Sequence, residues 1–125
     1  MEIGDELDFE LDFESRQPTQ EIYLSFVISS VQFGEAVHSG SYFLPIANFP
    51  TPRTSGKMLI KVGKIPLMLG QYTVTFWVGK TYDFTEHLQD FVAFEVADKD
   101  IFERGKAPLP VCPMWWKSDF ELIEA

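Results

Sequence analysis

Apolar and polar residues alternate almost without error at the start of the chain. In residues 6–14 every second side chain is apolar, and the side chains between them are acidic. The apolar set is Leu7, Phe9, Leu11 and Phe13, and the acidic set is Glu6, Asp8, Glu10, Asp12 and Glu14. A period of two places these sets on opposite faces of a strand. The pattern therefore predicts a half-buried strand whose acidic face lies in solvent.

Strand patterns recur along the rest of the chain, between segments rich in turn residues. We expect strands at 22–29, 36–44, 57–65, 71–78, 91–96 and 111–116, with a further short one at 120–123. Turns or loops are predicted at 15–19, 33–35, 45–56 and 97–110, where Gly, Pro, Asn and Ser gather. One stretch differs, because Phe84, Leu88 and Phe91 have helical spacing and predict one or two helical turns within 79–90.

Seven or eight short strands separated by turns are typical of an all-β protein. We therefore predict a two-sheet antiparallel β-sandwich of immunoglobulin-like or jelly-roll type. The chain has 125 residues, the size of one domain, so residues 1–125 are expected to form a single sandwich. The aromatic content of 15% agrees with this prediction, because aromatic side chains favour pleated surfaces.

The charge balance argues against two classes of partner. Ten Lys and Arg face nineteen Asp and Glu, which gives a net charge of −9. This charge repels phosphate backbones and anionic membrane surfaces, so neither nucleic acid nor a membrane is an expected partner. No apolar run approaches the roughly 18 residues of a membrane span, and the acidic N-terminus does not resemble a secretory signal.

The residues that commonly carry catalysis give no convincing pattern. Cys112 is the only cysteine and is expected to be an inert thiol. His38 and His87 lack ligand-spaced partners, and carboxylates on alternate residues of a strand lie along a line rather than around a cation. Lys57 follows Ser-Gly without the upstream glycine of a phosphate-binding loop. We therefore expect neither an enzyme nor a bound metal or cofactor, although a hydrolase or metal-dependent jelly-roll stays a third hypothesis.

Aromatic side chains on the polar faces of the predicted strands are more informative. Trp77 shares a face with Thr75, and Tyr23 shares one with Ser25. The apolar C–H face of a sugar ring stacks on aromatic planes, while nearby polar groups bond to its hydroxyls. Candidate carbohydrate-binding residues are Trp77 as the platform, Tyr23, Thr75 and Lys61 as polar neighbours, and Asp83 and His87 from the adjoining segment. Alternatively, Trp77 packs under residues 79–90 or lies in a dimer interface.

Several segments resemble one family of sandwich domains. Residues 65–74, Ile-Pro-Leu-Met-Leu-Gly-Gln-Tyr-Thr-Val, resemble that family's I-P-L-L-P-G-x-Y-x-V stretch, with Leu69 where a proline is usual. Residues 90–96 resemble its D-A-x-x-F-x-V strand, residues 98–105 its D-x-x-G-x-G connection, and residues 111–116 its closing strand. The family is the C-terminal carbohydrate-binding domain of the ATPase subunit in ABC exporters of bacterial O-antigen polysaccharide, a part of lipopolysaccharide.

The resemblance implies an immunoglobulin-like sandwich that recognises a polysaccharide without catalysis before export. It implies a homodimer, in which the C-terminal strand is a candidate for exchange between protomers. It also implies a cytoplasmic location at the inner face of the bacterial inner membrane. If the chain is part of a longer one, the exporter's ATPase and membrane subunits are partners. The alternative is a protein-interaction or dimerisation sandwich without a glycan ligand.

Overall fold

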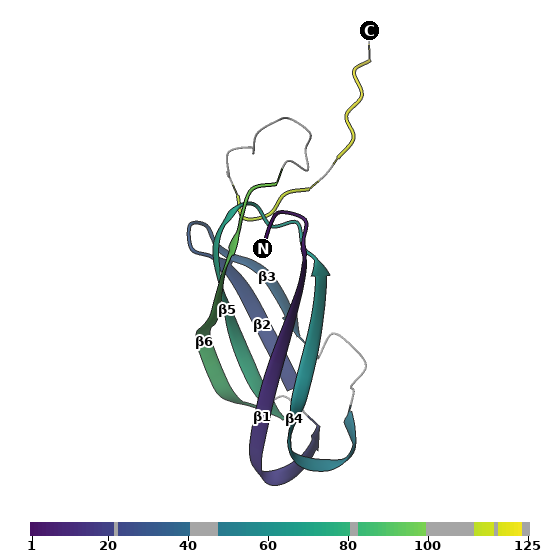
Figure 1. Cartoon of the computed structure of the whole chain (residues 1–125), viewed down its shortest axis with the longest axis vertical. Helices are drawn as coiled ribbons and strands as arrows, with labels where there is room; N and C mark the ends of the chain where they lie inside the picture. The colour runs from purple at the N-terminus through teal and green to yellow at the C-terminus, as the bar shows by residue number, and fades with distance from the viewer. Residues whose placement is uncertain (22, 41–47, 81–82, 100–111, 117, 124–125) are drawn as a thin grey trace.

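The computed structural model describes residues 1–21, 23–40, 48–80, 83–99, 112–116 and 118–123. Within these residues the chain forms six strands and no helix (Figure 1). The strands are β1 (Glu6–Glu21), β2 (Tyr23–Ser30), β3 (Gly34–Gly40), β4 (Asn48–Lys64), β5 (Gly70–Lys80) and β6 (Asp83–Val96). None of the described segments is a helix long and apolar enough to cross a membrane.

The strands form two antiparallel sheets. β1 pairs with β4, and the larger sheet has the order β3-β2-β5-β6. The two-stranded sheet lies across one face of the larger sheet (Figure 1). The predicted fold class, an all-β sandwich of two antiparallel sheets, is therefore confirmed, with six strands in the described part of the chain.

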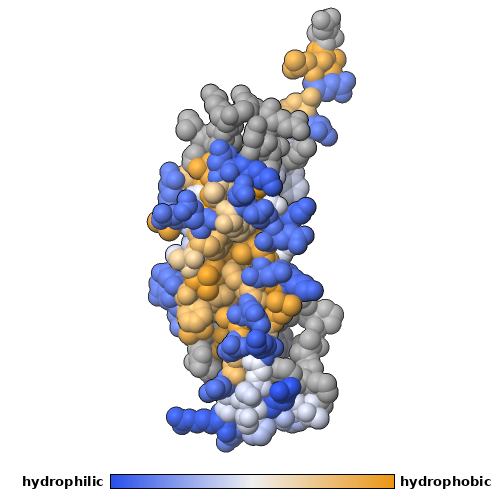
Figure 2. All heavy atoms as spheres, in the orientation of Figure 1, coloured by the Kyte–Doolittle hydropathy of each residue, from blue (hydrophilic) through white to orange (hydrophobic). Residues whose placement is uncertain are grey.

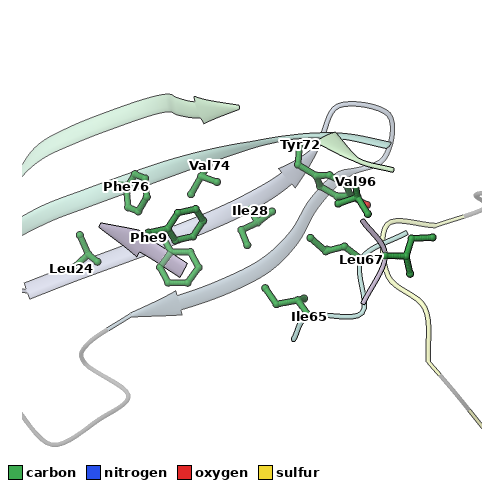
Figure 3. Close-up of a cluster of buried hydrophobic side chains, with 11 residues drawn as sticks. Phe9, Leu24, Ile28, Ile65, Leu67, Tyr72, Val74, Phe76 and Val96 are labelled. Carbon is green, nitrogen blue, oxygen red and sulfur yellow. The ribbon is translucent and has the colours of Figure 1, made fainter. Parts of the chain in front are cut away.

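The core lies between the inner faces of the two sheets. The alternation in β2 and β5 turns Leu24, Phe26, Ile28, Tyr72, Val74 and Phe76 toward the smaller sheet (Figure 3). Phe9 of β1 enters this layer edge-on, with its ring centroid 5.7 Å from Phe26 and 5.5 Å from Phe76. Edge-to-face rings stabilise one another beyond the apolar area they bury. Phe9 thus joins the two layers at the centre of the sandwich.

The acidic face of β1 is exposed, as its alternation predicts. Leu7, Phe9, Leu11 and Phe13 are buried or half-buried, whereas Glu6, Asp8, Glu10, Asp12 and Glu14 are exposed. The Lys57 Nζ atom lies 2.9 Å from Glu10 Oε1, and Lys61 is the strand partner of Asp8. The hydrogen bond that Lys57 donates to the Glu10 carboxylate, together with the charge of that carboxylate, raises the pKa of Lys57. The acidic row is thus a solvated face, partly neutralised by β4.

Two predicted turns are wrong because both strands of the small sheet are longer than expected. β1 continues to Glu21, through residues 15–19, and β4 begins at Asn48, inside the proline-rich segment. Each of these strands has only one partner among the described residues, so a proline can sit there without removing a ladder hydrogen bond. The register of β1 against β4 shifts between Glu14 and Thr19, so the turn-forming residues between them lie in an irregular part of the strand.

The predicted helical turns are also wrong, because residues 83–96 form strand β6. The misleading spacing comes from a bulge. Val92 pairs with Val74 and Leu88 with Phe76, so four residues of β6 match two residues of β5. Phe91, three residues after Leu88, falls within this bulge, so its position departs from the strand period of two and imitates helical spacing.

The C-terminal segment differs from prediction too. Residues 112–116 contain an isolated bridge, from Met114 to Leu67, rather than a strand, and residues 120–123 form none. Trp115 anchors the segment, because its backbone N–H donates to Pro66 O at 2.8 Å and its indole N–H to Leu67 O at 3.2 Å. Residues 22, 41–47, 81–82 and 100–111, which belong to several of the predicted strands and loops and to the predicted helical turns, lie outside the described residues.

Candidate functional site

The outer face of the four-stranded sheet carries the predicted aromatic platform. Ser25, Trp77 and His87 are direct strand partners across β2, β5 and β6. Opposed side chains on neighbouring strands have their Cβ atoms about 5 Å apart, which suits ring stacking. The Trp77 and His87 rings stack accordingly, with centroids 4.8 Å apart and planes 8° from parallel.

The stacking of Trp77 on His87 determines which of the two rings is accessible to a ligand. Trp77 is half-buried and His87 is exposed. The imidazole covers one face of the indole, and β6 is the last strand of its sheet among the described residues. The outermost flat surface at this edge is therefore His87, with Trp77 behind it.

Tyr23 and Thr75 share the face of Trp77 but lie below its surface. β2 and β5 are adjacent, and Tyr23 is the partner of Gly79, two residues from Trp77. The exposed fraction is 3% for Tyr23 and 7% for Thr75. The predicted clustering of these residues with Trp77 is thus found, but both form the base of the site rather than its accessible surface.

Thr75 has a specific task in this base. Its Oγ1 accepts a hydrogen bond of 3.1 Å from the backbone N–H of Asp90, in the β6 bulge. Asp90 has a φ of +48°, a left-handed conformation that non-glycine residues rarely adopt. The Thr75 hydroxyl therefore holds a strained turn of the backbone beside the Trp77–His87 pair.

The other two predicted site residues lie elsewhere. Lys61 is exposed on β4, in the two-stranded sheet, so it does not share the face of Trp77. Asp83 begins β6, opposite Lys80, four residues before His87 along the strand. Sequence alternation assigns a residue to a face of its own strand, but it does not show which sheet the strand joins.

A polar pair on the other side of the same face was not predicted. Ser25 Oγ lies 3.0 Å from Nε2 of His38, on edge strand β3, and 3.3 Å from the carbonyl oxygen of Ser39. Ser25 is only 4% exposed, so these contacts satisfy a buried hydroxyl. Among the described residues, no group of three or more His, Cys, Asp or Glu is placed to hold a metal ion.

These features define an antiparallel β-sandwich with an aromatic–imidazole pair at one edge of its larger sheet. A solved protein, the C-terminal domain of Wzt, has the same fold. The match has a TM-score of 0.59 and 14% sequence identity, and covers 98% of this chain and 73% of that one. No protein-family model and no curated protein matches the sequence. The fold implied by the family resemblance is therefore confirmed.

Proposed function

We propose that this domain recognises a bacterial O-antigen polysaccharide for export by an ABC transporter, by binding alone. The observation that carries the proposal is the fold match to the C-terminal domain of Wzt over 98% of the chain. Wzt is the ATPase of an ABC O-antigen exporter. The sequence motifs in residues 65–74 and 90–96 resemble the same kind of domain. Fold alone does not fix function, so the proposal also rests on the site.

The Trp77–His87 pair supports recognition of a sugar. Two stacked rings give a flat, rigid surface, which matches the apolar C–H face of a sugar ring. Exposed polar side chains of β6 lie beside it and can bond to sugar hydroxyls. The net charge of −9 favours uncharged or amino-bearing sugars over anionic ones.

The partners follow from the same proposal. The domain acts in the cytoplasm, at the inner face of the inner membrane, with the exporter's ATPase and membrane subunits. We also propose a homodimer in which the C-terminal segments are exchanged. Residues 118–123 extend away from the sandwich, and Phe120, Leu122 and Ile123 are 83–100% exposed (Figures 1 and 2). Such apolar side chains are stabilised when a second protomer covers them.

The alternative function is a protein-interaction or dimerisation sandwich without a glycan ligand. The same exposed C-terminal side chains favour it, together with Phe91 of β6, which is 56% exposed. The two functions differ in one respect that can be measured. The glycan-binding domain needs an accessible Trp77–His87 pair, whereas the interaction module does not.

Binding to immobilised O-polysaccharides tests the proposal. A panel of purified bacterial O-polysaccharides is probed with the wild-type domain, Trp77→Ala and Lys61→Ala. We expect wild type and Lys61→Ala to bind the same polysaccharide, because Lys61 lies on the other sheet. Trp77→Ala is expected to lose binding and to keep the far-ultraviolet circular dichroism of wild type. Absence of wild-type binding across the panel contradicts the proposal and favours the interaction module.

A further inference from the structure

Of the two strands that flank Trp77's strand β5, β6 offers accessible groups next to the platform in the described part of the chain, whereas β2 does not. The nearest side chains on β2 and β5, Tyr23, Ser25 and Thr75, are 3%, 4% and 7% exposed. On β6, by contrast, His87, Gln89 and Asp90 are all exposed. A ligand that approaches Trp77 therefore meets β6 first.

We propose that His87, Gln89 and Asp90 of β6 form the sugar-contacting surface, and that Trp77 and Thr75 act as positioning residues behind it. This inference rests on the proposed function and states which residues perform it. It changes the role expected for Trp77, from the ligand's own stacking partner to the support of the imidazole that stacks on the ligand.

The bulge at Asp90 is the feature of β6 that indicates a functional role for this strand. A residue with a left-handed backbone stores strain, and such residues gather at functional sites. Bulges re-aim side chains and are common next to such sites. Here the bulge is held from below, because the Thr75 hydroxyl accepts the Asp90 N–H at 3.1 Å. The strained geometry is thus fixed before any ligand arrives.

The exposed groups suit an uncharged or amino-bearing sugar. Asp90 supplies a carboxylate, which accepts hydrogen bonds from neighbouring hydroxyls or from an ammonium group. Gln89 supplies an amide that both donates and accepts. His87 lies three residues from Asp90, within about 10 Å along the strand. A ring surface, an amide and a carboxylate are therefore all exposed within four consecutive residues of β6.

The direct test measures the affinity of the polysaccharide that wild type binds in the panel. Asp90→Asn removes the charge but keeps the shape, and Asn tolerates a positive φ. We expect Asp90→Asn and His87→Ala to weaken binding roughly ten-fold or more, the effect of losing a strong polar or stacking contact. Glu95→Gln, an exposed carboxylate on the same strand, and His38→Ala, an imidazole on the opposite edge strand, are expected to bind within about two-fold of wild type.

The positioning role of Thr75 has its own readout. Thr75→Val removes the acceptor of the Asp90 N–H, so hydrogen exchange at that amide is expected to accelerate while affinity falls. Thr75→Ser keeps the hydroxyl and is expected to restore both. In the Asp90→Asn background, Thr75→Val is expected to weaken binding by less than it does in wild type, since the carboxylate it positions is gone.

The outcomes separate this inference from the proposed function. If wild type binds a polysaccharide and both Asp90→Asn and His87→Ala bind it equally well, the β6 surface is refuted and glycan recognition stands. If wild type binds no member of the panel, glycan recognition fails and the β6 surface fails with it.

Discussion

Phe9 is the side chain on which the joining of the two sheets most depends. It is 7% exposed, and its ring meets Phe26 at an interplanar angle of 72° and Phe76 at 88°. Both partners belong to the larger sheet, whereas Phe9 belongs to the smaller one. Truncation of this ring therefore removes the central contact between the layers.

The expected cost can be worked out from these contacts. A buried Phe→Ala change lowers the free energy of unfolding by about 3–5 kcal/mol, the sum of lost burial and a residual cavity. Each edge-to-face pair contributes about 0.5–1.5 kcal/mol of its own. With two such pairs lost, Phe9→Ala should lie toward the upper part of the range. A domain of this size is stable by about 5–15 kcal/mol, so the variant is strongly destabilised.

Urea unfolding followed by circular dichroism measures this loss. Phe9→Leu keeps most of the apolar volume and is expected to cost about 1–2 kcal/mol, so it reports on the same contact even if Phe9→Ala does not fold. Val31→Ala is the control, since Val31 is 66% exposed, and should match wild type within about 0.5 kcal/mol. A loss below about 1 kcal/mol for Phe9→Ala would refute the described packing of the sheets.

Three further predictions concern other parts of the chain. Asp90→Val should lower the unfolding free energy by about 1–3 kcal/mol and Asp90→Gly should not, because at a φ of +48° a β-branched residue is more strained than Asp and glycine is not strained. Equal urea midpoints for the two variants would contradict this. Burial, with a smaller effect of Cys112, raises the pKa of Tyr72 from 10.0 to about 12. The native state therefore holds this proton more tightly, and stability should fall as the pH rises from about 10 to about 12. Urea titrations of Tyr72→Phe should lack the loss of stability that Tyr72 causes between about pH 10 and about pH 12. An identical pH dependence in wild type and Tyr72→Phe would contradict the raised pKa of Tyr72. Removal of residues 118–125 should convert the proposed homodimer to a monomer in light scattering, whereas an unchanged mass would show that the segment is not the dimer contact.

The sequence predicts those strands whose two faces differ in polarity. The alternation is unbroken in residues 6–14 of β1 and in residues 71–78 of β5, so their faces follow directly from the order of residues. In β6 the bulge at Asp90 breaks the period and imitates helical spacing. In β4 the prolines indicate a loop, although an edge strand tolerates them. The errors in β4 and β6 share a cause. Whether a strand contains a bulge or tolerates a proline depends on the strands paired with it, which the local sequence does not show.

The candidate site also combines features that the sequence predicts with features that it does not. Trp77 and His87 could both be selected from the sequence, because their residue types suit a sugar and lie near each other in the chain. Their stacking depends on the register of β5 and β6, which no local pattern encodes. The burial of Tyr23 and the separation of Lys61 depend on the sheet order in the same way. Asp90 was visible as one acidic residue among nineteen, and only its backbone conformation distinguishes it.

The most direct measurement is a chemical-shift map of the ¹⁵N-labelled domain titrated with each O-polysaccharide of the panel. We expect one polysaccharide to shift amides of β5 and β6 around Trp77, His87 and Asp90, together with the Trp77 indole N–H, and to leave the amides of β1 and β4 unchanged. Shifts confined to β1 and β4, or no shifts with any polysaccharide, would contradict this expectation.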